Sequence, residues 1–509
     1  MTQEFDHIIV GAGSAGCAVA ARLAELTTDR ICVIEAGPSD ADLRVKMPFG
    51  LVNLLGGPRD WARKTVPQEN LGGRQVSVPR GKMLGGSGSI NSMAWFRGRS
   101  DDFDGWETPG WGWSDVAPAF EAVEGALQPR RLANPHPLAE GFGRAFGGND
   151  PQSAPTPERQ SAGVCHANLH DGRRWSAADA FLRPAQKTGR VEVITGAEVD
   201  KVVMDGDRAA GVLLRDGRKI AANAGVILSA GSIETPMILM RSGLGPAAHL
   251  SERGIDPVRD IPGIGANLHD HPGVGLHFAG SGSGYGLTLS QMPRWALAPF
   301  AWAFARRGVF ASPTVEACAF FRAMPGEGRP DAQCHFIPFM LGWKGKAITW
   351  GAGYFADVVV SRPRSRGSLT LGADRFTPAI DLNLLSDPYD LQVLMNGIPR
   401  LRQILKDAPL DPHRAPEGHP GELVTGDALE TFIRKGCGTA YHPVGTVAMG
   451  ENGPLAADLS LKGVTGLTVA DASVMPKVTS ANTNAPSMMI GWRAGGFVAD
   501  RARAAKEAA

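Results

Sequence analysis

The sequence predicts an α/β protein in which a discontinuous, doubly wound domain holds a second, α+β domain built on an antiparallel sheet. Three observations predict this architecture. A strand–turn–helix–strand unit opens the chain, a run of short strands follows at residues 191–230, and Trp, Phe and Pro become more frequent from residue 276 onward. The chain has 509 residues, which is too many for one compact core and suits two domains.

The opening unit consists of two short apolar runs on either side of an Ala/Leu-rich stretch. The runs at residues 5–10 and 30–34 predict buried parallel strands, and residues 17–26 predict the helix that joins them. Glu35 and Ala36 follow the second strand directly. A carboxylate at this place accepts hydrogen bonds from ribose hydroxyls and repels a 2′-phosphate, so Glu35 is predicted to bind a dinucleotide without that phosphate.

The turn between the first strand and the helix has the spacing G-x-G-x-x-G. Gly11 permits the tight turn, Gly13 lets backbone amides reach a pyrophosphate, and Gly16 allows the helix to pack closely on the strand. Ser14 lies in the same turn, and the helix N-terminus adds a partial positive charge that favours phosphate. The motif predicts a dinucleotide but does not separate FAD from NAD.

The later part of the chain supplies further elements. Turns at residues 205–207 and 216–217 divide the strand run, residues 128–160 predict a surface loop, and residues 482–505 predict a closing helix. The predicted division has five parts: residues 1–130, 186–275 and 436–509 form the dinucleotide domain, residues 131–185 form connecting loops, and residues 276–435 form the inserted substrate domain.

Composition narrows the possible partners and the location. Lys and Arg total 52 against 51 for Asp and Glu, so no nucleic-acid partner is predicted. No window is long and apolar enough to span a bilayer, and the six cysteines are predicted to be buried free thiols, so we expect a cytoplasmic protein without an integral membrane segment. The apolar helix at residues 295–305 is expected to pack over a substrate pocket, with membrane contact as the alternative.

Several further segments carry motifs that resemble those of the glucose–methanol–choline (GMC) oxidoreductase family. They lie at residues 81–91, 231–246, 262–272, 441–446, 470–473 and 482–486. The resemblance runs over nearly the whole chain and is closest to bacterial members of the choline-dehydrogenase-like and polyol-dehydrogenase-like type. It implies a Rossmann-like FAD-binding domain, an inserted substrate domain and oxidation of an alcohol.

The resemblance also implies which residues hold the cofactor. Some family members attach the flavin to a histidine in the 81–91 segment, where this chain has Ile90, so we expect non-covalent FAD. The other residues that it assigns to FAD are Gly85, Gly86, Ser87, Asn91, Val199, Ala230, Gly231, Asp471, Ala472, Asn482, Ala485 and Pro486.

The predicted catalytic pair is His442 and Asn484. Removal of a hydroxyl proton suits an imidazole, whose pKa lies near neutrality, and His442 lies in the family-like motif at residues 441–446, so it is the predicted general base. Asn484 matches the position at which many family members carry a second His or an Asn, and its amide is predicted to orient the alcohol. Tyr441 and Glu316 are predicted to face the substrate, although Glu316 is equally compatible with a salt-bridged strand residue.

No metal site is predicted. His269 and His271 have metal-like spacing but no third ligand follows, and the Cys334-His335 pair is predicted to belong to the core.

The predicted reaction converts a primary alcohol to the aldehyde, with O2 or another acceptor reoxidising the flavin. The alternatives are a lyase or other non-oxidative flavoenzyme on the same fold, a non-catalytic flavin-binding protein, and a nicotinamide enzyme. The particular alcohol, the choice between oxidase and dehydrogenase, and the oligomeric state are not determined by the sequence.

Overall fold

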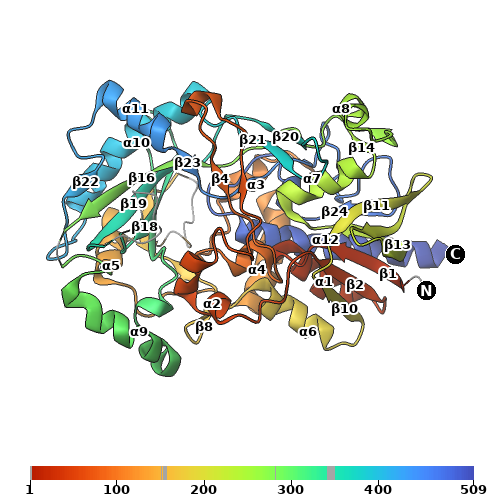
Figure 1. Ribbon diagram of the computed structural model, residues 1–509, viewed down its shortest axis with the longest axis horizontal. Helices are drawn as coiled ribbons and strands as arrows, with labels where there is room; N and C mark the ends of the chain where they lie inside the picture. The colour runs from red at the N-terminus through yellow and green to blue at the C-terminus, as the bar shows by residue number, and fades with distance from the viewer. Residues whose placement is uncertain are drawn as a thin grey trace.

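The computed structural model describes residues 3–148, 150, 152, 158–280, 282–340 and 350–508. Figure 1 shows two sheets at opposite ends of the longest axis, with both chain termini beside the same sheet. The chain passes between the two ends several times, because the element order along the sequence alternates between the sheets.

The sheet beside the termini has a parallel core extended by an antiparallel meander. The order is β10-β2-β1-β13-β12-β11, and the short strand β24 also pairs with β13, in parallel. The central strand β2 is buried throughout and β1 is buried from His7 to Val10, as expected for strands covered on both faces. The strands are β1 (Gln3–Val10), β2 (Ile31–Glu35), β10 (Val191–Thr195), β11 (Val199–Asp205), β12 (Arg208–Leu214), β13 (Lys219–Leu228) and β24 (Leu467–Val469).

Two helices from opposite ends of the chain pack against one another beside this sheet. They are α1 (Ser14–Leu26) and α12 (Asn484–Ala508). A Cβ added to Gly491 of α12 would lie 2.3 Å from the carbonyl oxygen of Ala15, so only glycine allows this approach. The close packing brings the residues just before α12 to the turn that opens α1.

The second sheet is antiparallel and has the order β22-β16-β19-β18-β17-β6, with β23 paired to β16. One face is covered by α5 (Pro137–Gly143) and α10 (Pro388–Asp407), whose residues contact Phe336 and Val358. The opposite face looks toward the first sheet. The strands are β6 (Ser161–Val164), β16 (Pro272–Ala279), β17 (Ala317–Phe321), β18 (Ala332–Ile337), β19 (Gly353–Val360), β22 (Glu417–His419) and β23 (Gly438–Thr439).

Shorter elements connect and flank the two sheets. The remaining α-helices are α2 (Leu43–Lys46), α3 (Ser100–Asp104), α4 (Trp113–Leu127), α6 (Arg183–Gln186), α7 (Gly231–Arg241), α8 (Ala247–Glu252), α9 (Met292–Ala305) and α11 (Gly426–Gly436). The remaining strands are β3 (Arg63–Lys64), β4 (Ser77–Val78), β5 (Arg130–Arg131), β7 (His166–Ala167), β8 (Leu169–His170), β9 (Arg173–Arg174), β14 (Leu244–Gly245), β15 (Arg259–Asp260), β20 (Ser368–Leu371) and β21 (Pro378–Asp381).

The predicted fold class is confirmed, and one local prediction is wrong. Residues 128–160 were expected to form a surface loop, but α5 lies within them because its apolar side chains pack on the second sheet; residues 149, 151 and 153–157 lie outside the described residues. The domain boundaries stay predictions.

The six cysteines are buried and free. Among the described residues, no helix has the length and hydropathy to cross a membrane.

Candidate active site

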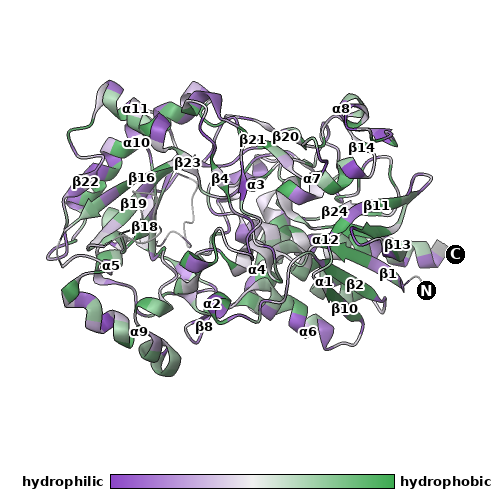
Figure 2. Ribbon diagram, in the orientation of Figure 1, coloured by the Kyte–Doolittle hydropathy of each residue, from purple (hydrophilic) through white to green (hydrophobic). Residues whose placement is uncertain are grey.

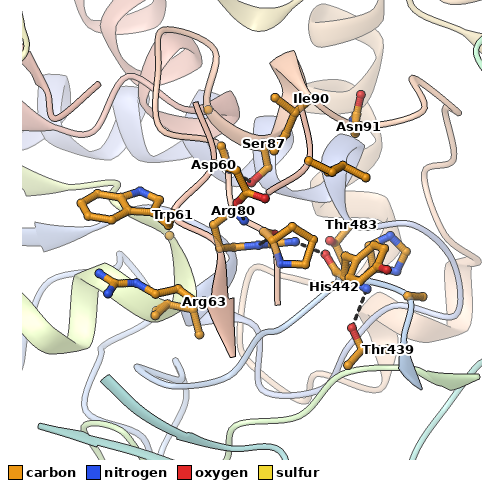
Figure 3. Close-up of a pocket in the computed structure, with 18 of the residues that line it drawn as sticks. Asp60, Trp61, Arg63, Arg80, Ser87, Ile90, Asn91, Thr439, His442 and Thr483 are labelled. Carbon is orange, nitrogen blue, oxygen red and sulfur yellow. Dashed lines mark hydrogen bonds between the residues drawn. The ribbon is translucent and has the colours of Figure 1, made fainter. Parts of the chain in front are cut away.

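A cavity of about 1190 Å³ extends from the turn after β1 to the face of the antiparallel sheet. Figure 3 shows Arg80, Ser87, Asn91 and His442 around this cavity. The glycine-rich turn lies at one end, and strands β16, β18 and β19 provide the wall at the other end. One continuous space therefore adjoins both the predicted dinucleotide site and the predicted catalytic histidine.

The three glycines of the turn meet different surroundings. Gly11 has a φ of +96°, and a Cβ on it would lie 2.5 Å from the carbonyl oxygen of Ser229. A Cβ on Gly16 would lie 2.0 Å from the carbonyl oxygen of Gly11, so this glycine serves close helix–strand packing. A Cβ on Gly13 would have no atom nearer than 3.9 Å and Gly13 lines the cavity, so a side chain there would enter the space for a ligand.

Glu35 is held at the end of β2 by backbone amides. Its Oε2 accepts a hydrogen bond from Ala12 N at 3.0 Å, and its Oε1 accepts one from Gly37 N at 2.8 Å. Burial raises the pKa of Glu35 to about 7. Hydroxyl groups of a ribose would supply further hydrogen-bond donors to the charged form, so the site fits the ribose of a dinucleotide.

The first residue of α12 reaches the same turn. Ser14 Oγ donates a hydrogen bond to Asn484 Oδ1 at 2.7 Å. The Nδ2 group of Asn484 is buried and has no hydrogen-bond partner among the described residues, and Asn484 lines the cavity. A buried donor of this kind costs stability unless a ligand accepts its hydrogen bond. The open glycine and this donor together fit FAD, which when bound supplies the acceptor for a hydride.

The segment predicted to lie against the flavin is a 3₁₀ turn over Gly86–Ser89. A Cβ on Gly86 would lie 2.8 Å from Gly13 Cα, so the two glycine turns touch through bare backbone. The buried Arg174 holds the end of this segment by donating to Asn91 Oδ1 at 2.8 Å. Ile90 lines the cavity and has no nucleophilic atom, which supports the prediction of non-covalent FAD.

Most residues predicted to bind the cofactor line the cavity. These are Gly11, Gly13, Ser14, Glu35, Ala36, Gly86, Ser87, Asn91, Val199, Ala230, Gly231, Ala472 and Asn482. Five others lie behind the wall: Gly16, Gly85, Asp471, Ala485 and Pro486. Asp471 has a supporting place, because its Oδ2 accepts from Gly231 N at 2.8 Å and from Thr235 Oγ1 at 2.6 Å.

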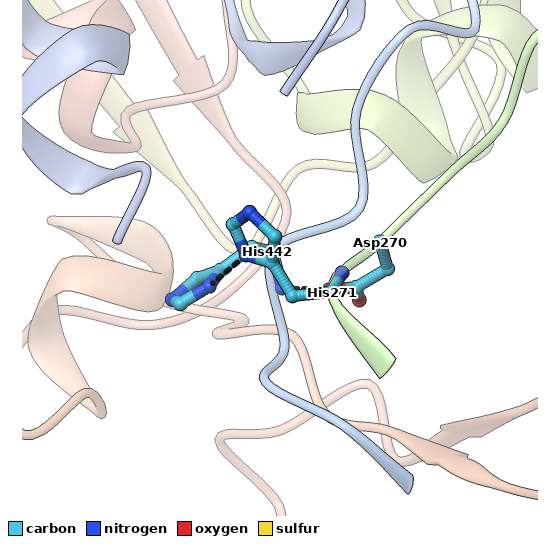
Figure 4. Close-up of side chains that lie close together, drawn as sticks. All are labelled: Asp270, His271 and His442. Atoms are coloured by element: carbon cyan, nitrogen blue, oxygen red, sulfur yellow. Dashed lines mark hydrogen bonds between the residues drawn. The ribbon is translucent and has the colours of Figure 1, made fainter. Parts of the chain in front are cut away.

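His442 lies in the cavity wall between two nitrogen partners. Its Nδ1 lies 3.1 Å from Nδ1 of His271, and its Nε2 lies 3.1 Å from Nδ2 of Asn482. Figure 4 shows the two imidazoles with Asp270, whose Oδ1 accepts a hydrogen bond from His442 N at 2.9 Å. Burial, followed by the charges of His271, His335 and Arg80, holds the pKa of His442 well below 6.5, so its imidazole is neutral at pH 7.

These partners determine which nitrogen of His442 carries the proton. His271 Nε2 lies 2.9 Å from the carbonyl oxygen of Thr479, so it must donate there. Burial lowers the pKa of His271 to about 4, so His271 is neutral and its Nδ1 accepts a hydrogen bond from the N–H at Nδ1 of His442. The Nε2 atom of His442 is then unprotonated and accepts a hydrogen bond from Nδ2 of Asn482. An unprotonated nitrogen facing a cavity is the arrangement that a general base requires.

Asn482, rather than Asn484, lies beside His442. The Oδ1 atom of Asn482 accepts a hydrogen bond from Gln333 Nε2 at 3.0 Å and lies 3.3 Å from His335 Nε2, which orients its Nδ2 toward His442. The sequence prediction gave the pairing role to Asn484 and a cofactor role to Asn482. In the structure Asn482 lies beside His442 and Asn484 lies beside Ser14, because Asn484 is the first residue of α12.

His335 and Asp357 face the cavity from neighbouring strands. His335 Nδ1 lies 3.1 Å from Asp357 Oδ2. Burial acts to lower the pKa of His335, but the charge and the hydrogen bond of Asp357 outweigh it and the pKa is raised. The sequence prediction that Cys334 and His335 both belong to the core is therefore wrong for His335. Alternate residues of a strand face the same side, so the positions of Gln333, His335 and Ile337 in β18 could have indicated that His335 faces the cavity.

The two residues predicted to face the substrate differ in position. Tyr441 lines the cavity and has a φ of +67°. Glu316 does not line it: its Oε2 accepts from His136 N at 2.6 Å, and its Oε1 accepts from Ser312 Oγ at 2.6 Å. Burial raises the pKa of Glu316 to about 7. Its carboxyl group joins two loops behind the wall, so the structure does not support substrate contact.

A glycine-rich dinucleotide turn joined by one cavity to a neutral, half-buried histidine indicates a dinucleotide-dependent oxidoreductase. Models of GMC oxidoreductases match residues 5–273 and 363–491. The chain belongs to the GMC oxidoreductase family, and its cofactor is FAD.

Known relatives match the chain over nearly its full length. It is 36% identical to the oxygen-dependent choline dehydrogenase of Sinorhizobium medicae (strain WSM419), covering 96% of this chain and 95% of that protein. It is 37% identical to the enzyme of the same name from Brucella suis biovar 1 (strain 1330), covering 98% and 96%. The crystal structure of pyridoxine 4-oxidase from Mesorbium loti matches with a TM-score of 0.85 at 27% identity, covering 96% of this chain and 98% of that one.

Proposed function

We propose that the protein oxidises a primary alcohol bound between His442 and Asn482, with Nε2 of His442 accepting the hydroxyl proton. The observation that carries this proposal is the unprotonated Nε2 atom facing a cavity that continues to the dinucleotide turn. An alcohol oxygen placed between the two side chains donates its proton to His442 and accepts a hydrogen bond from Nδ2 of Asn482. Proton removal there makes loss of hydride from the carbinol carbon favourable.

The surroundings of His442 support its change of charge. Asp270 lies close to both imidazoles, and its Oδ2 is buried without a hydrogen bond among the described residues. Burial raises the pKa of Asp270 to about 6, so this carboxyl group is mostly ionised at pH 7. Its negative charge stabilises the imidazolium that forms when His442 takes the proton.

Separate substitutions of the two asparagines test their roles. Asn482→Ala removes the donor beside His442 and is expected to slow flavin reduction by about 10–100-fold, the effect of losing one hydrogen bond to a charged centre. Asn484→Ala is expected mainly to lower FAD content, because its free Nδ2 lies at the dinucleotide turn. Anaerobic stopped-flow reduction at equal FAD loading distinguishes them. A larger loss of rate in Asn484→Ala would restore the pairing predicted from sequence.

For the substrate, we propose a small primary alcohol that carries a positive charge, such as choline. The choline dehydrogenases among the relatives support this proposal. The cavity wall also contains the Asp357 carboxylate together with the rings of Phe355 and Phe432. A carboxylate and aromatic faces are groups that recognise a quaternary ammonium ion.

An anaerobic screen of alcohols tests both parts of the proposal. Choline is expected to bleach the flavin, and its uncharged analogue 3,3-dimethylbutan-1-ol is expected to do so with at least tenfold lower kcat/KM, with dithionite as a control for complete reduction. Equal kcat/KM for the two alcohols would refute the cationic specificity alone. No bleaching by any of choline, pyridoxine, benzyl alcohol and aliphatic primary alcohols would refute alcohol oxidation.

The electron acceptor and the location complete the proposal. We propose O2 as the acceptor, supported by the oxygen-dependent relatives, and admission of air after the anaerobic screen measures whether the reduced flavin reoxidises. We also propose a reducing compartment such as the cytoplasm. The buried free cysteines support this location, because disulfides are rare there.

A further inference from the structure

The helix α9 has a buried aromatic face and an exposed apolar face. On the inner side, the ring of Trp295 lies 5.7 Å from Phe49 and 5.9 Å from Phe339, and Trp302 Nε1 donates to the carbonyl oxygen of Gly172 at 2.8 Å. This packing fixes the helix against the protein. Ala298 of α9 belongs to the same apolar cluster as Val315 and Ile337, which line the cavity. The helix therefore packs beside the cavity wall, as the sequence analysis expected.

The outer side of α9 and the turn before it carry large apolar residues in contact with water. The exposed fractions are 85% for Phe304, 61% for Phe300, 62% for Leu297 and 81% for Leu289. Figure 1 places α9 at the edge of the molecule, and Figure 2 shows hydrophobic residues along it. Four large apolar side chains at one edge form a patch of the kind that marks a partner or a membrane.

The charged residues on α9 and directly after it are basic. The exposed Asp171 lies near the end of the helix, next to Gly172, which lies against Arg306. The sequence contains no Asp or Glu between Asp270 and Glu316, whereas Arg294, Arg306 and Arg307 lie on or directly after α9. Arg294 and Arg307 are exposed. An apolar face whose own charged residues are all arginines is complementary to the interfacial region of a bilayer that contains anionic lipids.

We propose that α9, with Leu289 before it, binds the surface of a membrane that contains anionic lipids. Leu297, Phe300 and Phe304 enter the acyl boundary, while Arg294 and Arg307 contact lipid phosphates. The helix lies in the plane of the interface and does not cross the bilayer. This association adds to the proposed alcohol oxidation and does not depend on it, because none of these five side chains lines the cavity.

Sedimentation of the holoenzyme with vesicles tests this inference. The wild type is expected to pellet with phosphatidylcholine vesicles that contain 30% phosphatidylglycerol, and to bind pure phosphatidylcholine much more weakly. The double variant Phe300→Glu/Phe304→Glu is expected to lose at least tenfold in binding. Each of Arg294→Gln and Arg307→Gln is expected to weaken binding to the anionic vesicles by about fivefold, the effect of one arginine near such a surface.

A matched control places the same two charges elsewhere on the surface. Leu423 and Val258 are exposed by 96% and 52%, so Leu423→Glu/Val258→Glu is expected to bind vesicles like the wild type. Both double variants should keep the FAD content and the activity of the wild type in solution. The proposal is overturned if the wild type stays in the supernatant, or if Phe300→Glu/Phe304→Glu pellets equally. It is also overturned if light scattering shows a dimer that this variant dissociates, because a second copy then covers the face.

Discussion

Replacement of His442 by alanine is expected to slow anaerobic flavin reduction by about 10²–10⁴-fold, the usual contribution of a general base. The Nε2 atom of His442 faces the cavity. It is unprotonated because the hydrogen bonds of His271 to Thr479 and to His442 place the proton of His442 on Nδ1. Stopped-flow absorbance at saturating alcohol measures the effect, after FAD content has been matched. His413→Ala, which changes a histidine outside the cavity, is the control and should reduce at the wild-type rate.

The pH dependence should follow from the depressed pKa of His442. Burial and neighbouring positive charges disfavour the imidazolium, so the neutral base is present above the folded-state pKa and is lost as the pH falls through it. The wild-type rate of flavin reduction is therefore expected to be constant from pH 6.5 to 8 and to decrease only at lower pH. His442→Ala should lack this acidic limb. A variant that retains both the rate and the limb would exclude His442 as the base.

Replacement of Gly13 by valine is expected to give a folded protein without FAD. A Cβ at Gly13 meets no atom nearer than 3.9 Å, so the protein itself can accept the side chain. The side chain would then occupy the cavity at the turn where backbone amides approach a pyrophosphate. The ratio of flavin to protein absorbance measures the loss, and circular dichroism shows whether the fold is kept.

Two other glycines provide the comparison for Gly13→Val. Gly496→Val on α12, where an added Cβ meets nothing within 4 Å, should remain folded and yellow. Gly16→Val should fail to fold, because its Cβ would lie 2.0 Å from the carbonyl oxygen of Gly11. A soluble Gly13→Val protein with the flavin content of the wild type would show that the dinucleotide does not bind at this turn.

The sequence by itself determined the fold class and the cofactor, and it predicted the dinucleotide turn and the role of His442. Apolar runs and glycine spacing depend on local backbone geometry, so residues close together in the sequence are enough to recognise them. The same logic explains why α5 was missed within residues 128–160. Its seven residues are stabilised by stacking of Phe142 on Phe336 of β18, a contact across the chain that no local pattern records.

Only the tertiary structure decided which side chains meet in the active site. Asn482 and Asn484 are two residues apart, and their roles separate because the start of α12 turns one toward Gln333 and the other toward Ser14. Strand pairing likewise directs His335 into the cavity, and the loop contacts of Glu316 hold that carboxyl group behind the wall. These contacts join residues that lie far apart along the chain. Their geometry is set by the packing of whole helices and strands, which a short sequence motif does not specify.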